Sequence, residues 1–232
     1  MRYFILFCAA GYLAGATEVR ADSLDCDAIR TTLIPYQIRF TKDHSVWREL
    51  HTVQLVRDPS GSDAISGRVN STTSFIRKGI SLNGSLVAVE RQYFKRDSHS
   101  YIDRWTNEIE GIDPKQVDYR IDLSFVFKEK FERIGGKELD LVRSYDVFYK
   151  YRKTDNILVS PCSFIAHMGE TTLTERKTGQ AHTIFSWYFP DLRLLVGNPS
   201  PDVTFQSIST TFEPIDFEEP NWPPASSKVN DH

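Results

Sequence analysis

The sequence predicts a mainly β fold: a large curved antiparallel sheet, in the form of a half-barrel or barrel, with one or two short helices. Apolar and polar residues alternate along many short segments, as they do in strands with one buried face. Turn-forming residues separate these segments. Aromatic residues make up 12% of the 232 residues and concentrate in the alternating segments. A sheet of about nine or ten strands curls rather than staying flat, so we expect a half-barrel or a closed barrel.

The N-terminus has the pattern of an export signal. Arg2 precedes an apolar run over residues 3–16, and Val19 and Ala21 stand at the −3 and −1 positions of a cleavage site. A competing site ends at Ala16, and a buried N-terminal helix is the other interpretation. The apolar run is shorter than the about 20 residues that a membrane span needs.

Three regions follow from this pattern and from the composition. We expect a signal peptide (residues 1–21), a single β-rich domain (22–212) and a Pro-rich acidic tail (213–232) that is extended or disordered. The mature protein is expected to be periplasmic or secreted, with no transmembrane span.

Removal of the signal peptide would leave two cysteines, Cys26 and Cys162. An isolated pair in an oxidising compartment is a natural disulfide, so we expect these two to be linked. The alternative is two buried free thiols.

The first element of the domain is expected to be a short helix over residues 22–33, capped by Asp22 or Ser23. Its apolar residues share one face: Cys26, Ile29 and Leu33.

Alternation then predicts strands over residues 34–41 and 46–57. Residues 66–78 carry few large apolar side chains, which indicates an edge strand or a loop. Asn83-Gly84 is the strongest hairpin signal, because these residue types suit the two positive-φ positions of a type I′ turn. Residues 100–111 fit a short helix, with a strand over residues 101–107 as the alternative, and the spacing of Tyr101, Trp105 and Ile109 slightly favours the helix.

The clearest alternation lies in residues 117–129, where one face is almost wholly polar. A face of that kind meets water, which favours an antiparallel sheet. A strand over residues 139–152 follows, and a turn is expected at Thr154-Asp155-Asn156.

The C-terminal part of the domain predicts a three-stranded meander. Its strands cover residues 164–176, 183–189 and 192–196, and they are separated by a polar turn at residues 177–180 and by Pro190-Asp191. A last strand is expected over residues 203–212.

The formal charge of −3 and the scattered Lys and Arg residues give no indication of nucleic-acid binding. The sequence has no P-loop, no Gly-x-Gly-x-x-Gly and no Gly-x-Ser-x-Gly, and its six histidines do not have the spacing of a zinc site. We therefore expect no cofactor, no metal and no catalytic residue that the sequence can identify. Four acidic residues could pair as catalytic carboxylates, although a solvated sheet face explains them more simply: Asp118, Asp122, Glu129 and Asp140.

Aromatic side chains on the predicted strands are the strongest indication of a binding site. If they face a concave surface that side chains do not fill, they form an apolar cavity. The alternative is that they make up the core. The candidate lining residues are Tyr119, Phe125, Phe127, Tyr145, Tyr149, Phe185, Trp187 and Phe189.

The segment Ser186-Trp187-Tyr188-Phe189-Pro190-Asp191-Leu192, together with the export signal and the strand layout, resembles uncharacterised periplasmic β-proteins of Gram-negative bacteria. Their half-barrel is similar to that of the lipoprotein carriers of the LolA/LppX type. The resemblance covers about a fifth of the chain and implies that a concave sheet binds an acyl chain or another apolar partner.

These observations favour an exported, non-enzymatic protein whose curved sheet binds a lipid-like or apolar small molecule, or an envelope protein. One alternative is an envelope-directed hydrolase whose histidines and carboxylates come together on folding. Another is a structural interaction module that presents an apolar patch or a sheet edge.

Overall fold

The computed structural model describes residues 24–31, 36–44, 47–57, 62–70, 75–93, 101–134, 140–198 and 203–210. The elements of the first half are α1 (Cys26–Thr31), β1 (Tyr36–His44), β2 (Trp47–Val56), β3 (Ser62–Asn70), β4 (Phe75–Leu82), β5 (Ser85–Tyr93) and β6 (Tyr101–Glu110). Those of the second half are η1 (Pro114–Gln116), β7 (Leu123–Ile134), β8 (Asp140–Val159), β9 (Cys162–Glu175), β10 (Ala181–Phe189), η2 (Pro190–Leu192), β11 (Leu194–Asn198) and β12 (Val203–Thr210).

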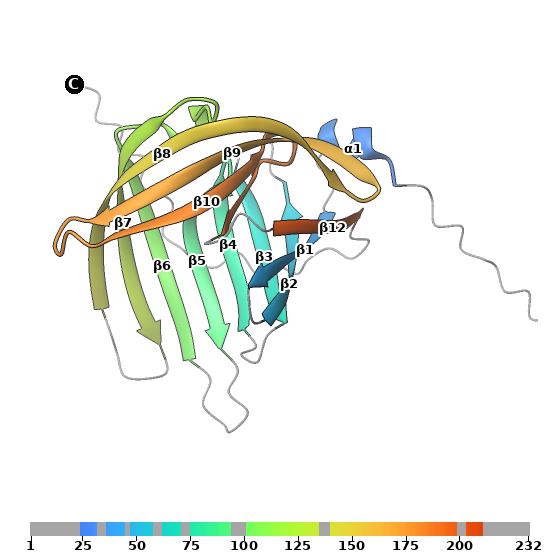
Figure 1. Ribbon diagram of the computed structural model, residues 1–232. Coiled ribbons are helices and arrows are strands. Elements are labelled where there is room, and N and C mark those ends of the chain that lie inside the picture. The colour runs from blue at the N-terminus through green and yellow to red at the C-terminus, as the bar shows by residue number, and fades with distance from the viewer. Residues whose placement is uncertain are drawn as a thin grey trace, which may run out of the picture.

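The described strands form one twelve-stranded antiparallel sheet in the order β11-β10-β9-β8-β7-β6-β5-β4-β3-β2-β1-β12. Strands β1 to β11 pair with their neighbours in sequence, and β12 returns to pair with β1. The sheet curls strongly, with β8, β9 and β10 arching over the wall that β4 to β7 form (Figure 1). The predicted fold class, a large curved antiparallel sheet with a short helix, is confirmed.

Helix α1 is fixed to the sheet by its first residue. The Asp25 carboxylate accepts hydrogen bonds from the backbone N–H groups of Asp27 and Ala28, both at 3.0 Å, and so caps the helix. The expected caps, Asp22 and Ser23, lie outside the described residues. The predicted disulfide is confirmed: Cys26 is bonded to Cys162 on β9, 136 residues away.

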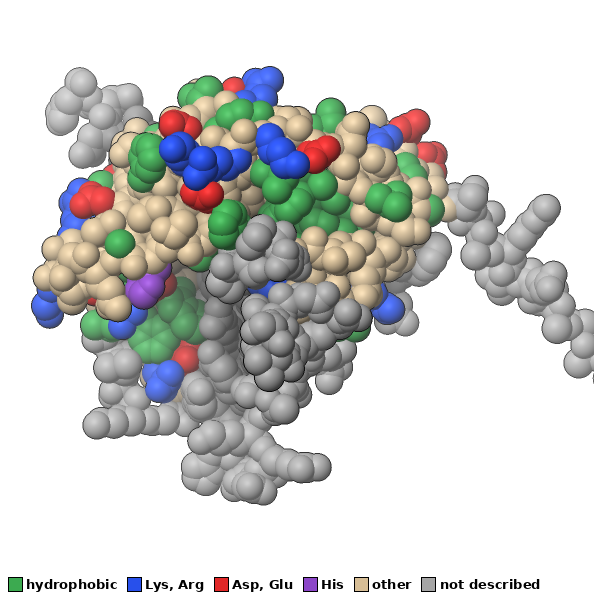
Figure 2. Space-filling view, viewed as in Figure 1, with side chains coloured by type: hydrophobic (Ala, Val, Ile, Leu, Met, Phe, Trp, Pro, Cys, Tyr) green, Lys and Arg blue, Asp and Glu red, His purple; other side chains and the backbone are tan. Residues whose placement is uncertain are grey.

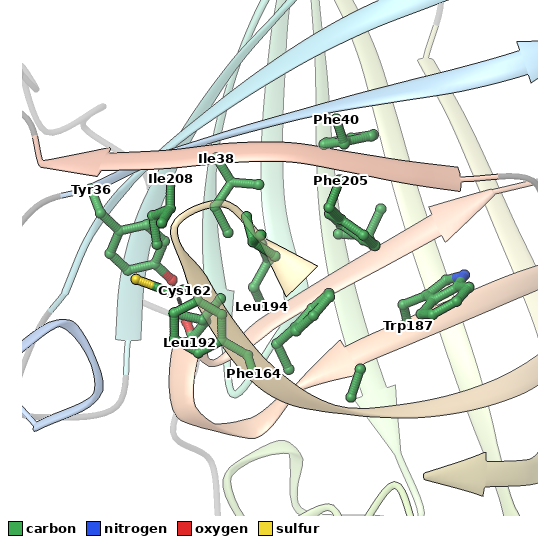
Figure 3. Close-up of a cluster of buried hydrophobic side chains, with 14 of the residues drawn as sticks. Tyr36, Ile38, Phe40, Cys162, Phe164, Trp187, Leu192, Leu194, Phe205 and Ile208 are labelled. Atoms are coloured by element: carbon green, nitrogen blue, oxygen red, sulfur yellow. Dashed lines mark hydrogen bonds between the residues drawn. The ribbon is translucent and has the colours of Figure 1, made fainter. Parts of the chain in front are cut away.

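The main core lies where the two ends of the sheet meet. Trp187 and Phe189 of β10 pack against Phe205 of β12, with ring centroids 5.9 and 4.9 Å apart. Phe205 also contacts Phe40 of β1 (Figure 3). Tyr188, on the opposite face of β10, is buried against other aromatic rings, so β10 is covered on both faces. The sheet is therefore rolled, and its C-terminal strands lie within the curve.

A polar corner holds these strands in place. The Tyr36 hydroxyl donates to the Leu192 carbonyl at 2.6 Å, and Arg57 donates to the Asp191 carbonyl at 2.5 Å. Arg193, in the left-handed region at φ 47°, donates to the buried Asp63 carboxylate at 2.6 Å. These contacts fix η2 against β1 and β3, which explains why the chain folds back at the Pro190-Asp191 turn.

Residues 101–110 form strand β6, so the helix that the spacing slightly favoured is wrong. Trp105 pairs with Phe131 and Ile109 pairs with Phe127 on β7. A spacing of four residues is compatible with both the helical period and the strand period. The pairing with β7 is what makes this segment a strand. Residues 66–70 and 75–78, for which an edge strand or a loop was expected, belong to β3 and β4 inside the sheet.

Two predicted boundaries are wrong. Thr154-Asp155-Asn156 is not a turn, because β8 runs through it and pairs continuously with β9; a register shift between Tyr151 and Lys153 is the only irregularity in this pairing. Strand β7 begins at Leu123 rather than at residue 117, and residues 117–122 form a loop.

The C-terminal meander β9-β10-β11 and the Asn83-Gly84 hairpin are confirmed. The expected signal peptide and the acidic tail lie outside the described residues. None of the helices in the described ranges is long and apolar enough to cross a membrane.

Candidate functional site

A partly open cavity of about 370 Å³ lies between the wall β6–β8 and the inner face of β9–β11. Its walls are mainly apolar side chains that alternate along the strands, so each strand contributes every second residue. The lining residues are Gly84, Ser85, Trp105, Asn107, Ile109, Phe125, Phe127, Glu129, Val147, Thr171, Leu173, Ile184, Ser186, Leu195 and Gly197.

The cavity extends along strand β7. Phe125, Phe127 and Glu129 occupy successive inward positions, and they span about 13 Å at the usual strand rise of roughly 3.3 Å per residue. Leu123, the inward residue before Phe125, packs against a cluster of tyrosines. The cavity therefore has one end at the tyrosines and another at Glu129.

The tyrosine cluster consists of Tyr119, Tyr149 and Tyr188. The rings of Tyr119 and Tyr188 stack with centroids 4.1 Å apart, and Tyr149 meets Tyr119 edge-on at 5.5 Å. The Tyr149 hydroxyl donates to the Tyr119 carbonyl at 3.0 Å. Burial raises the pKa of all three phenols, so they are neutral at ordinary pH.

The Asn83-Gly84 turn completes this end of the cavity. The Asn83 side chain accepts a hydrogen bond from the Tyr188 hydroxyl and donates to the Val117 carbonyl. A Cβ on Gly84 would lie only 3.0–3.1 Å from the Tyr188 ring and from Leu195, so glycine permits both the positive φ and the close approach. The hairpin and the loop over residues 117–122 thus close the cavity together.

The eight predicted lining residues do not share one surface. Phe125 and Phe127 line the cavity, Tyr145 packs beside Phe127 with centroids 6.2 Å apart, and Tyr119 and Tyr149 belong to the tyrosine cluster. The other three, Phe185, Trp187 and Phe189, lie on the opposite face of β10.

That opposite face has two parts. Trp187 and Phe189 belong to the main core. Phe185 and Trp187 also line a smaller pocket of about 230 Å³, beside Met168 and the side chains of Arg152 and Lys153. The outer surface above β8 and β9 carries charged groups of both signs among hydrophobic ones (Figure 2). Arg152 on β8 and Glu170 on β9 form an ion pair at 2.6 Å.

Sequence reasoning missed several lining residues. Trp105 and Ile109 were obscured by the helical interpretation of residues 100–111. Ile184 lies on the same strand as the predicted Phe185 but on its other face, and alternation alone does not say which face meets a cavity. The glycine, serine and threonine residues of the lining have no sequence pattern that would mark them as part of a cavity.

The described contacts of His167 and His182 do not include the carboxylate that the hydrolase alternative requires. His167 is buried, its pKa is lowered by burial, and its Nδ1 lies 2.9 Å from the Thr154 hydroxyl rather than from a carboxylate. His182 pairs with Leu173 across the hairpin, so the two histidines do not face each other.

Asp118 and Asp122, which lie in the same loop, have separate partners. Hydrogen bonds from Arg120 lower the pKa of Asp118 to about 2, and Asp122 accepts from the backbone N–H of Tyr151. Glu129 lies in the cavity, and the side chain of Asp140 is outside the described set. Within the described ranges, no group of three or more His, Cys, Asp or Glu residues has a metal-binding arrangement.

Comparison of this chain with known protein families, with curated proteins and with solved structures gave no match. Its function therefore has to be inferred from the geometry of the cavity.

Proposed function

We propose that this chain is an exported, non-enzymatic binding protein that holds a lipid-like or other apolar small molecule inside its rolled sheet. The observation that carries the proposal is the cavity of about 370 Å³ with mainly apolar walls. Small-molecule sites typically measure roughly 300–1,000 Å³ and combine apolar walls with a few polar groups. A small molecule, rather than a protein partner, fits this volume.

The size of the cavity argues that it is more than a packing defect. Protein interiors leave few voids larger than a water molecule, whereas this one has room for about ten waters.

The walls are built to persist without a ligand. The tyrosine cluster and the Asn83-Gly84 turn close one end through hydrogen bonds, and the η2 corner fixes the strands that form the inner wall. A preformed cavity loses less conformational entropy on binding than one that must assemble around its ligand. Export, and with it a ligand in the cell envelope or outside the cell, is part of the proposal and rests on the pattern of residues 1–21.

Fluorescence titration with Nile red, a neutral apolar dye, tests the proposal on the purified protein. Wild type is expected to bind the dye and enhance its emission. Ile184→Trp replaces an isoleucine side chain of the lining by the larger indole ring, which fills part of the cavity. This variant is expected to bind the dye at least tenfold more weakly. Thr183→Trp is the matched control, because Thr183 directly precedes Ile184 on β10 and is exposed. Binding should then match wild type.

Circular dichroism shows whether both variants keep the β fold. Dye binding that Ile184→Trp leaves unchanged, or the absence of any binding to the folded wild type, would count decisively against an apolar ligand in this cavity.

A further inference from the structure

We infer that the cavity selects its ligand by length: it accepts one alkyl chain of about ten carbons, and the end of that chain stops at a floor formed by Gly84, Ser85 and Leu195. This inference rests on the proposed function, because it concerns the same cavity.

The floor lies directly against the tyrosine cluster. A Cβ on Gly84 would be 3.0 Å from the Tyr188 ring. The Ser85 hydroxyl is 2.9 Å from the Tyr119 hydroxyl, and the Leu195 side chain packs against the cluster. All three floor residues belong to the cavity lining. A chain that enters the cavity therefore meets these residues first, with the tyrosine rings behind them.

The tyrosine rings behind the floor are held in place. The three residues are between 2% and 6% exposed. The Tyr149 hydroxyl donates to the Tyr119 carbonyl, and the Tyr188 hydroxyl donates to the Asn83 side chain. Moving a ring aside would leave a buried hydroxyl without its partner, which is unfavourable. A longer chain therefore cannot deepen the cavity by displacing the rings.

The length of the cavity sets the number of carbons. The inward positions from Phe125 to Glu129 span about 13 Å along β7. An extended alkyl chain advances about 1.25 Å per carbon, because its bonds of about 1.5 Å follow a zigzag, so about ten carbons cover this span. The volume of about 370 Å³ gives a similar number, since a methylene group takes up about as much space as a water molecule. There is room for one such chain.

The apolar walls make binding depend on chain length up to this limit. Each methylene group that passes from water into the cavity should strengthen binding about fourfold. Methylene groups beyond about the tenth remain outside the cavity and should add little. The affinity of a homologous series is therefore expected to rise and then level off.

Displacement of Nile red by unbranched primary alcohols tests the inference, because these probes are neutral and differ only in length. The series is hexanol, octanol, decanol, dodecanol and tetradecanol, each below its solubility limit. For wild type, affinity is expected to rise about 15-fold with each step of two carbons as far as decanol. From decanol to tetradecanol it should change less than about threefold in total.

A variant of the floor tests where the chain ends. Leu195→Ala removes most of one floor side chain, so the levelling should move from decanol to about dodecanol. Leu158→Ala is the matched control, because Leu158 on β8 is 64% exposed and does not line the cavity. It should level off at decanol, as wild type does. Circular dichroism establishes that both variants keep the β fold, and the wild-type series tests the inference even if Leu195→Ala does not fold.

The outcomes separate the two proposals. Affinity that keeps rising to tetradecanol, that levels off before octanol, or that levels off at decanol in a folded Leu195→Ala protein overturns the length inference and leaves the apolar site standing. The same holds if the dye binds and no alcohol displaces it. If the dye does not bind and none of the alcohols binds, the proposed function is overturned, and the inference with it.

Discussion

Replacement of Gly169 by alanine should damage the closed end of the cavity. Gly169 faces the ring of Tyr149, and a Cβ at this position would lie less than 3.0 Å from three atoms of that side chain. Tyr149 cannot easily retreat, because it is 2% exposed, donates a hydrogen bond to the Tyr119 carbonyl and packs edge-on against the Tyr119 ring. The added methyl group must therefore displace the ring.

The expected loss of stability is about 2–3 kcal/mol. Overpacking of a core costs about 1–3 kcal/mol, and loss of a buried hydrogen bond adds about 1 kcal/mol. The smaller entropy of the unfolded alanine chain offsets about 0.4–1 kcal/mol of this. Urea unfolding, followed by far-UV circular dichroism, measures the difference as a lowered midpoint at unchanged slope.

Gly197→Ala is the matched control. Its Cβ would meet only the Ile184 Cδ1 atom at 3.4 Å, an ordinary contact, so this variant should be within about 0.5 kcal/mol of wild type or slightly more stable. Adding Gly169→Ala to a Tyr149→Leu background should cost much less than it does alone, since the clash is already relieved. A Gly169→Ala protein as stable as wild type would refute the packing described for the tyrosine cluster.

Three further predictions concern the framework. Cys26→Ser with Cys162→Ser opens a loop of 136 residues, and should lower stability by about 4–5 kcal/mol in the chain-entropy treatment; equal melting temperatures of variant and wild type under non-reducing conditions would contradict this. Arg193→Ala removes a partner of the buried Asp63 carboxylate and should cost about 3 kcal/mol in urea unfolding. Arg193→Gly should cost about 1 kcal/mol less, because glycine adopts the φ of 47° freely, and a glycine variant no more stable than the alanine variant would argue against backbone strain here. Finally, burial raises the pKa of Tyr149 and Tyr188 above 10.0, so the unfolded chain binds fewer protons at high pH. The stability that these two neutral phenols contribute is fully present below pH 10 and should decline as the pH rises further. Urea midpoints that stay constant from about pH 8 to pH 11 would contradict this prediction.

Local sequence signals predicted the features that depend on a few adjacent residues. Asn83-Gly84 gave the hairpin because few other residue pairs adopt two consecutive positive φ angles. The polar turn at residues 177–180 and the Pro190-Asp191 break gave the C-terminal meander. The disulfide followed from counting cysteines in an expected oxidising compartment.

The roll of the sheet could not be predicted, because it depends on contacts between distant strands. Residues 186–189 are buried in succession, but alternation in that strand does not reveal that Phe205 covers one face and Tyr119 the other. The cavity was misassigned for the same reason: Phe185, Trp187 and Phe189 were grouped with Phe125 and Phe127, although they point the opposite way.

The long strand β8 shows a second limit of sequence reasoning. Thr154, Asp155 and Asn156 are turn-forming types, yet they remain in the strand because each pairs with β9. Their side chains are exposed, so polar residues carry no desolvation penalty there. Turn propensity is then overridden by the continuous pairing of β8 with β9.

A crystal structure of the protein soaked with dodecanol tests the central claim most directly. Electron density for the alkyl chain is expected among Phe125, Phe127, Leu173 and Ile184. A cavity closed by repacked side chains, or one that contains only ordered water while the probe binds elsewhere, would contradict it.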